Sequence, residues 1–264
     1  MIRVKSLHIY PVKSLAGISV SKATIGDRGF ENDRRWMLID ENNRFLSQRE
    51  LPEMALIKTR IDFERLIVWH NAFPENLLQI SIPHPKNTSI EVSVWDDICK
   101  AIICPDEVAT WFSRILNFSC RLVYMPTNSH RYVDNRFAKN NEINSFSDDF
   151  PITIISQESL NDLNEKMELP ILMNRFRPNI VIEGCRPFEE DKLETFSING
   201  MNFNCAKPLA RCPIPTINQE TATKSKEPLA TLSKFRKRDN KIYFGQNLLY
   251  NGRGIINIGD QLTF

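Results

Sequence analysis

Residues 4–39 read VKSLHIYPVKSLAGISVSKATIGDRGFENDRRWMLI, and this stretch carries the pattern that decides the fold. Short runs rich in aliphatic and aromatic residues lie at 4–10, 17–25 and 34–39. Pro, Gly, Asn and Asp separate these runs, which is typical of strands joined by turns. Since no helical spacing lies between them, the runs predict a barrel or a strongly bent antiparallel sheet.

The same pattern continues over residues 56–61, 66–69, 78–82 and 90–95, so most of the first hundred residues are predicted to be strands. A helix is predicted next, beginning at Pro105-Asp106. Its apolar residues fall at i, i+3, i+4, i+7 and i+8 on one face: Val108, Trp111, Phe112, Ile115 and Leu116.

The pattern restarts near Cys120, which predicts two domains, 1–119 and 120–264. Residues 121–125 are predicted as a strand and the polar residues 127–149 as a long loop, a feature that is more often functional or mobile than idle. A strand is predicted at 152–155, followed by a helix that is capped by Ser156 and includes Leu160, Leu163 and Met167. An extended segment is predicted at 179–182, and a hairpin with its turn at Asn199-Gly200 joins residues 196–198 and 201–203. A short helix at 229–234 and strands at 242–244, 254–258 and 261–264 complete this half. The predicted class is mainly β with some helices (α+β), arranged as two β-barrel-like domains.

The composition excludes several classes of function. A formal charge of +2, with 25% charged residues, gives no overall field for nucleic acid. The one dense basic run, at 234–238, is interpreted as a solvated helix end. No apolar stretch approaches the roughly 20 residues of a membrane span, and the chain starts directly with strand-like alternation, so we expect no signal peptide and a cytoplasmic location. Six scattered cysteines are then expected to be reduced, and their spacing does not favour a zinc site.

Cys212 lies in the run Lys207-Pro208-Leu209-Ala210-Arg211-Cys212. A single free cysteine is most often an inert core residue. Here Arg211 is adjacent and Lys207 is five residues upstream, and a positive potential favours the thiolate. Prolines at 208, 213 and 215 are expected to stiffen a loop that presents the side chain. Because a soft thiolate selects soft or high-valent metals, Cys212 is a candidate metal ligand.

A second group of candidates is cationic. Lys13-Ser14 follows the first predicted strand, Arg34 begins another, and Arg177 lies within residues 174–180. An arginine beside an apolar strand is costly unless it reaches an anion, and such side chains bind phosphate well. The alternative is a set of surface salt bridges with Asp27, Asp33 or Glu183. Spacing alone does not show whether the cationic residues converge.

Taken together, these segments resemble one family. The matching residues are 10–14 (YPVKS), 33–36 (DRRW), 147–148 before Pro151, 156–164, 176–182 (FRPNIVI), 211–212, 226–229 with Leu232, 244–246 and 254–260. On these residues the chain resembles a MOSC-domain protein preceded by the N-terminal β-barrel domain of that family. Within the family it is most similar to the mitochondrial amidoxime-reducing component and to bacterial hydroxylaminopurine-detoxifying molybdoenzymes.

The resemblance implies a molybdenum cofactor (molybdopterin) between two domains, with Cys212 as the single protein ligand to the metal. It assigns the pterin and its phosphate to Lys13, Ser14, Arg34, Arg177 and Asn179. Asp148 and Arg211 are implied to lie near the metal and the pterin, and Asp148 is a candidate catalytic residue that relays a proton. The implied reaction is two-electron reduction of N-hydroxylated purines, amidoximes or hydroxylamines, with release of water.

The family commonly has a cysteine and a small polar residue before the Arg-Cys pair, where this chain has Leu209 and Ala210. Pro215 and Asn218 also depart from its pattern. The missing hydroxyl at Ala210 is expected to remove one hydrogen bond to the cofactor, worth roughly 1 kcal/mol.

Since the chain stops at Phe264 without a Cys-rich segment, we expect a separate electron donor, a ferredoxin or a cytochrome b5-like protein. We also expect a monomer. Two other readings stay open: a non-catalytic carrier of the cofactor or its sulfur, and an interaction protein with an inert Cys212.

Overall fold

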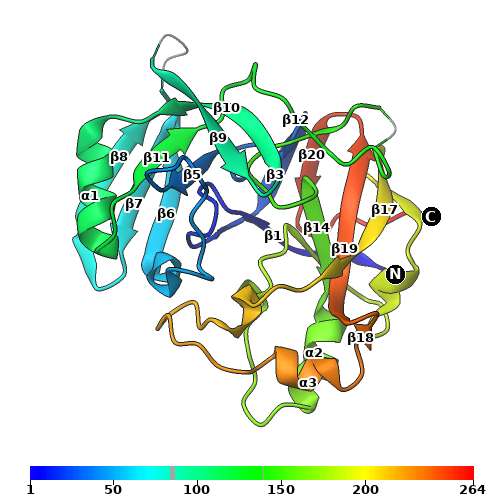
Figure 1. Ribbon diagram of the computed structural model, residues 1–264. Coiled ribbons are helices and arrows are strands. Elements are labelled where there is room, and N and C mark those ends of the chain that lie inside the picture. Colours follow the sequence, from blue (N-terminus) through cyan, green and yellow to red (C-terminus); the bar gives the residue numbers. More distant parts are fainter. Residues whose placement is uncertain (84–86, 139) are drawn as a thin grey trace.

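The computed structural model of the protein describes residues 1–83, 87–138 and 140–264. Two β-rich halves lie side by side, and both termini lie on the outer side of the second half (Figure 1). The mainly β class with a few helices is as the sequence predicts.

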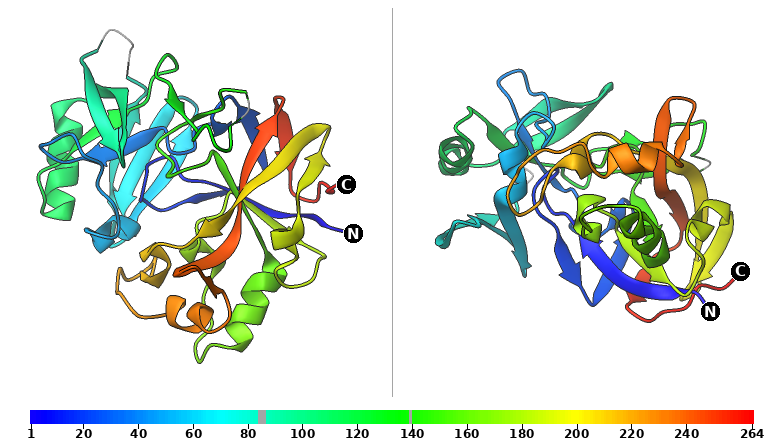
Figure 2. Two further views of the ribbon diagram at one scale, coloured as in Figure 1. Left: turned by 45° about the vertical axis from the view of Figure 1, so that its right-hand side comes forward. Right: turned by 90° about the horizontal axis from the view of Figure 1, so that it is seen from below.

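The second half is built on an eight-stranded sheet, in which two long twisted strands, one yellow and one orange, run side by side (Figures 1 and 2). The main path across the sheet is β16 (Thr195–Ile198), β17 (Met201–Ala210), β19 (Lys241–Asn251), β14 (Ile152–Ser156), β15 (Ile180–Glu183), β1 (Arg3–Ile9) and β2 (Ile18–Val20), with β18 (Lys237–Arg238) paired to β19. A smaller sheet of β20 (Gly254–Asn257), β3 (Lys22–Gly26) and β4 (Gly29–Phe30) shares its apolar core.

The C-terminal segment joins two distant parts of this sheet. Leu262 N donates to Ile2 O at 3.0 Å beside β1, and Ser197 N in β16 donates to Thr263 O at 2.8 Å. The backbone groups at one edge of the sheet are therefore paired, and the sheet curls into a barrel-like shape.

The first half has its own core under two antiparallel sheets. One contains β5 (Trp36–Ile39), β11 (Arg121–Tyr124), β10 (Asp97–Ile103) and β9 (Ser89–Val94), and the other contains β6 (Ile57–Asp62), β7 (Arg65–His70) and β8 (Phe73–Ser81). Helix α1 (Asp106–Leu116) covers this core with the predicted face, because Val108, Trp111 and Phe112 are buried. Its acidic first turn and the left-handed Asn117 at its end suit the helix dipole and the C-terminal cap.

Helix α2 (Gln157–Glu165) begins at Ser156, whose side chain accepts a hydrogen bond from Ser159 N, so the predicted N-cap is confirmed. Helix α3 (Leu229–Ser233) lies near α2 at the lower end of the second half (Figure 1). The remaining short elements are the 3-10 helices at Pro52–Leu56, Met173–Arg175, Glu189–Lys192 and Ile214–Thr216, and the paired strands β12 (Arg131–Tyr132) and β13 (Ile143–Asn144). Within the described residues, no helix is long and apolar enough to cross a membrane.

Most predicted strands are confirmed within one to five residues, and the Asn199-Gly200 hairpin is confirmed. The run 17–25 splits into β2 and β3. The prediction missed β10, and it was wrong for residues 261–264, which make single bridges instead of a strand. The predicted loop 127–149 contains the β12–β13 pair, and its residue 139 lies outside the described residues.

Strands β1 to β4, all within the first thirty residues, belong to the sheets of the second half. Strand β1 pairs with β15, β3 pairs with β20, and Val4, Leu7 and Ile25 are buried in that core. The division at residue 119 stays a prediction from the sequence, and the chain crosses between the two halves more than once.

Gly245 is expected to be a strict requirement of the larger sheet. Its φ is +84°, and an added Cβ would lie 2.6 Å from Ile155 Cγ1 and 2.7 Å from Ile154 O. Gly200 also has a positive φ, +76°, but an added Cβ there would meet no atom within 4 Å. Its substitution therefore measures the cost of the strained backbone alone. We predict that Gly200→Ala lowers the free energy of unfolding by about 1–2 kcal/mol, and that Gly245→Ala lowers it by several kcal/mol. Urea unfolding measures both, and equal losses would contradict the role of the close contact with β14.

Candidate functional site

The pairing of strands brings the segments that carry the predicted site residues to one edge of the larger sheet. Because β1 and β15 are antiparallel, with Leu7 opposite Ile180, the end of β1 lies beside the start of β15. The segment after β1 carries Lys13 and Ser14, and the segment before β15 carries Arg177. Tyr10 Oη donates to Pro178 O at 3.0 Å and ties the two segments together.

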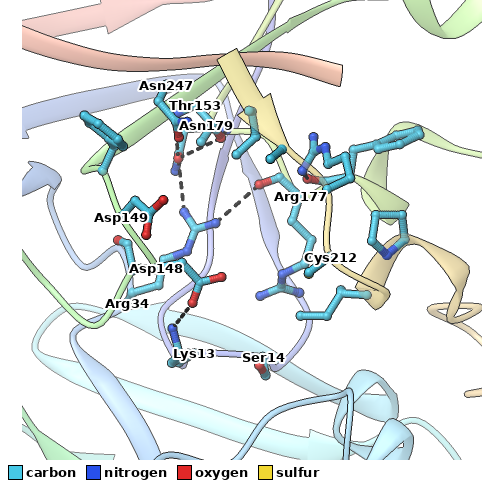
Figure 3. A pocket seen from close by; sticks show the side chains of 18 of the residues that line it. Lys13, Ser14, Arg34, Asp148, Asp149, Thr153, Arg177, Asn179, Cys212 and Asn247 are labelled. Carbon is cyan, nitrogen blue, oxygen red and sulfur yellow. Dashed lines mark hydrogen bonds and ion pairs between the residues drawn. The ribbon is translucent and has the colours of Figure 1, made fainter. Parts of the chain in front are cut away.

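A cleft opens at this edge, and residues from both halves line it. All eight predicted site residues belong to its lining: Lys13, Ser14, Arg34, Asp148, Arg177, Asn179, Arg211 and Cys212. Figure 3 shows Asn179, Thr153 and Asn247 together on one side and Lys13 and Ser14 on the other, with Arg34 and Arg177 between them. The lining holds six basic and two acidic side chains, so its net charge favours an anionic ligand.

The buried ring of Tyr10 organises two of the basic groups. The guanidinium carbons of Arg34 and Arg177 lie 4.2 and 4.3 Å from the centre of this ring. Gly17 leaves room for the ring, since a Cβ there would lie 2.4 Å from Tyr10 Cε1. Burial raises the pKa of Tyr10 to about 12 and lowers the pKa of Arg177 to about 10. The phenol is therefore neutral and Arg177 is charged at neutral pH.

Arg34 is fixed by polar contacts as well. Its Nη1 donates to Asp33 Oδ2 at 2.5 Å and to Asn179 Oδ1 at 3.1 Å, and its Nη2 donates to Arg177 O at 3.3 Å. The salt-bridge alternative is thus partly correct, because Asp33 does pair with Arg34. Asp27 and Glu183 pair elsewhere, and Arg177 donates to a backbone carbonyl, Leu15 O, at 2.6 Å.

Asn179 is buried, and its amide bonds to the protein. Its Oδ1 accepts from Arg34 and from Thr153 N (3.2 Å), and its Nδ2 donates to His8 O at 3.2 Å. These hydrogen bonds fix the Asn179 amide, and the amide in turn orients the Arg34 guanidinium. Ser14, with φ 67°, is also buried, and Gln48 Nε2 donates to its carbonyl at 2.7 Å.

The opposite wall carries an ion pair. Lys13 Nζ donates to Asp148 Oδ1 at 2.5 Å and to Phe146 O at 2.8 Å. Trp95 Nε1 donates to the same Asp148 oxygen at 3.1 Å. Burial lowers the pKa of Lys13, against the effect of Asp148. Desolvation acts to raise the pKa of Asp148, but the Lys13 ammonium, helped by Arg49 and the Trp95 N–H, holds this pKa well below its usual range.

Arg131 anchors the loop that carries Asp148. Its guanidinium donates to Ser145 O at 3.0 Å, to Ser147 O at 2.6 Å and to Asp148 O at 2.5 Å, and its Nε pairs with Asp97. Because this arginine is buried, the end of the predicted long loop is held firmly.

The segment before Cys212 differs from the expectation. Residues 201–210 form β17, so Lys207 and Pro208 lie in a strand instead of a stiffened loop; a bulge near Pro208 removes the need for its missing donor. Lys207 Nζ lies 3.4 Å from Asp149 Oδ2 and is absent from the cleft lining, so Arg211 is the basic neighbour of Cys212.

Arg211 is held beneath the cleft wall. Its Nε donates to Phe244 O and its Nη1 to Phe176 O, both at 3.0 Å. Its Nη2 is buried and has no hydrogen-bond partner in the described part of the chain. Burial lowers the pKa of Arg211 to about 10, against the effects of Cys212 and Tyr10. The half-buried thiol of Cys212 follows directly and faces the same cleft.

Several lining residues were missed by the sequence analysis: Arg49, Trp95, Ser147, Thr153, Arg175 and Asn247. Arg175 lies two residues before Arg177 in the same basic segment, which was an available signal. No such signal marked Arg49 or Trp95. Each is an isolated residue of its type in the surrounding sequence, and only the folding of the chain brings it to the cleft.

Comparison with known proteins agrees with this architecture. The family model for the MOSC N-terminal beta barrel domain matches residues 1–119, and the MOSC domain model matches residues 141–263. The mitochondrial amidoxime-reducing component 1 of Mus musculus is 31% identical over 275 residues, which cover 97% of this chain and 80% of the mouse protein. The chain belongs to the MOSC-domain family.

The molybdenum cofactor sulfurase of Oryza sativa subsp. japonica is 34% identical over 269 residues, covering 94% of this chain and 32% of the rice protein. The chain thus spans about a third of the length of such sulfurases. The crystal structure of the YuaD protein from Bacillus subtilis aligns over 99% of this chain and 94% of that chain, with 12% identity and a TM-score of 0.40.

Asp148 is expected to oppose anion binding in the cleft at every accessible pH. We predict that Asp148→Asn raises the affinity for sulfate roughly fivefold, because it removes a negative charge beside Lys13. Isothermal titration calorimetry measures this, and Asp134→Asn, which makes the same change of net charge outside the lining, is the control.

The depressed pKa fixes the pH dependence of this difference. As the pH falls from 7.5 to 4, Asp148 stays ionised, so the affinity ratio of the two proteins should stay constant. An Asp148 with an ordinary pKa of about 3.9 would be nearly half protonated at pH 4, and the ratio would shrink.

Proposed function

We propose that the protein is a molybdenum-cofactor-dependent oxidoreductase that reduces N-hydroxylated compounds. The observation that carries the proposal is one cleft in which a half-buried thiol, Cys212, lies among six basic side chains. The names of the relatives, an amidoxime-reducing component and a molybdenum cofactor sulfurase, support the same class of cofactor.

The residues present suit such a cofactor, which combines a dianionic phosphate with a metal that accepts a thiolate. The excess of basic groups in the cleft matches the charge of the phosphate. Arg211 Nη2 is a buried donor that needs an acceptor. A thiolate is a suitable ligand for a soft or high-valent metal.

In this proposal each side chain has a stated task. Lys13, Ser14, Arg34 and Arg177 hold the phosphate and the pterin, while Asn179 keeps Arg34 in place. Arg211 donates from below, and Cys212 is the protein ligand to molybdenum. When bound, the cofactor supplies the two-electron redox chemistry, and the protein supplies placement and electrostatics.

The proposed reaction breaks the N–O bond of an N-hydroxylated purine, an amidoxime or a hydroxylamine. Two electrons and two protons enter: one proton forms a new N–H bond in place of the N–O bond, and the other joins the released hydroxyl group, which leaves as water. The electrons come from a separate donor, a ferredoxin or a cytochrome b5-like protein. The monomeric state and the cytoplasmic location stay predictions from the sequence.

Asp148 has a narrower role than a general proton relay. Held ionised by Lys13, this carboxylate is a poor proton donor at neutral pH. It instead limits how strongly Lys13 attracts an anion, and it presents acceptor oxygens to the substrate side of the cleft. Asp148 is therefore proposed as a catalytic residue because of where its negative charge lies, and not as a proton donor.

A second candidate function is a carrier of the cofactor or of its sulfur. The similarity to molybdenum cofactor sulfurases over 94% of this chain favours it. A carrier would use Cys212 and the basic cleft equally, but it would not turn over an N-hydroxylated substrate or need an electron donor.

Cys212→Ser is predicted to separate metal binding from phosphate binding. The variant should lose activity and most of its molybdenum, because the thiolate ligand is gone, while the basic groups retain part of the pterin. Metal analysis and pterin fluorescence of protein from a cofactor-overproducing host measure this. Cys205→Ser, outside the cleft lining, is the matched control and should keep both. Full molybdenum content in Cys212→Ser would refute the assignment.

Reduction of benzamidoxime to benzamidine by the loaded wild type, with a reduced electron donor, tests the reaction itself. Deletion of the gene should also sensitise cells to an N-hydroxylated base. A loaded protein that fails with benzamidoxime, 6-hydroxylaminopurine and simple hydroxylamines would favour the carrier.

A further inference from the structure

Trp95 has a backbone conformation that a tryptophan seldom adopts. It is the first residue of the two-residue turn between β9 and β10, since Val94 pairs with Asp97. Its φ is +57°. A positive φ at this position of a hairpin turn is normally supplied by glycine, asparagine or aspartate, because a bulky side chain is strained there. Strain of this kind collects at functional sites, where the surrounding structure enforces it.

Three contacts hold the indole in the cleft. Its Nε1 donates to Asp148 Oδ1 at 3.1 Å, the guanidinium carbon of Arg49 lies 4.6 Å from its ring centre, and the ring of Phe45 lies at 5.1 Å. Despite these contacts, 49% of Trp95 is exposed, and the residue belongs to the lining that also includes Cys212. Burial alone therefore does not account for a tryptophan at this turn.

From this geometry we infer that Trp95 is the platform on which a flat substrate stacks, so that it determines specificity for planar N-hydroxylated groups. The inference rests on the proposed function and names the substrate class of the same site. Aromatic rings and conjugated N–C–N groups stack on an indole, whereas a small aliphatic hydroxylamine offers no such face.

The groups around Trp95 fit a ligand of that chemistry. Asp148 is an ionised carboxylate whose Oδ1 is shared by Lys13 and Trp95, and its side chain is 48% exposed. It can accept a hydrogen bond from an N–H group of a purine or an amidine. Arg49 Nη1 is buried with no hydrogen-bond partner among the described residues, so this face of the site also has an unused donor.

The first test compares kcat/KM for a planar and a non-planar substrate in the loaded enzyme. With Trp95→Gly we expect the values for benzamidoxime and 6-hydroxylaminopurine to fall about tenfold or more, mainly through KM, while that for N-methylhydroxylamine falls far less. Trp95→Phe should restore most of the selectivity. An unchanged ratio of planar to non-planar substrates in Trp95→Gly would overturn the inference.

Thermal unfolding distinguishes this role from a structural one. Glycine relieves the strained φ and offsets the lost ring contacts, so the unfolding midpoint of Trp95→Gly should stay within about 3 °C of the wild type. A structural role predicts a clearly lower midpoint without any change in selectivity, which would contradict the inference.

A binding test without turnover separates this inference from the proposed function. Adenine and benzamidine should quench tryptophan fluorescence in the wild type and in Trp69→Phe, but not in Trp95→Phe. Trp36 and Trp111 are buried, and Trp69 lies outside the lining. If no substrate is reduced, quenching at Trp95 would still support the platform while the proposed reaction fails. Absence of quenching at Trp95 would overturn the platform whatever the activity.

Discussion

The antiparallel pairing of β1 with β15 is the constraint on which the site depends. It sets the end of one strand beside the beginning of the other, although they are about 170 residues apart in sequence. Tyr10, just beyond β1, then places its ring against two arginines from different parts of the chain. The core under β1 fixes the register, because a slip of one residue would turn Leu7 and Ile9 out of the core and move Tyr10 from its place.

A cleft with this excess of positive charge is costly to the folded protein without a ligand. The lowered pKa values of Lys13, Arg177 and Arg211 all have burial as their main cause, so each cation has lost hydration. Backbone carbonyls, Asp33, Asp148 and the Tyr10 ring offset part of this cost. A bound dianion would offset more of it, so the ligand that the cleft selects should also stabilise the fold.

The sequence alone predicted the elements whose signals are local. The helix stripe ending at Leu116, the Ser156 cap and the Asn199-Gly200 turn each depend on neighbours within a few residues, and the structure has all three. Residue chemistry alone made Lys13, Ser14, Arg34, Arg177 and Cys212 candidates, but spacing could not show that they converge. The resemblance to a family added Asp148, Asn179 and Arg211 and implied a single site. Their shared cleft is a product of sheet pairing, which no local pattern encodes.

The errors have the same origin. Lys207 looked like a neighbour of Cys212 by its distance along the chain, but β17 alternates its side chains, and Lys207 lies near Asp149. Arg49 and Trp95 were not expected because a single polar or aromatic residue in a turn carries no signal of its own.

The two walls of the cleft differ in a way that bears on how a ligand would lie in it. The Arg34, Arg177 and Asn179 side is built from a buried amide and two partly buried arginines that hydrogen-bond one another and the backbone, which suits a permanently bound anion. The Trp95 and Asp148 side is half exposed and presents an aromatic face and an ionised acceptor, which suits a ligand that exchanges with solvent. Because both sides line one cleft with the Cys212 thiol, a resident group and a transient one can meet there without any rearrangement of the sheet.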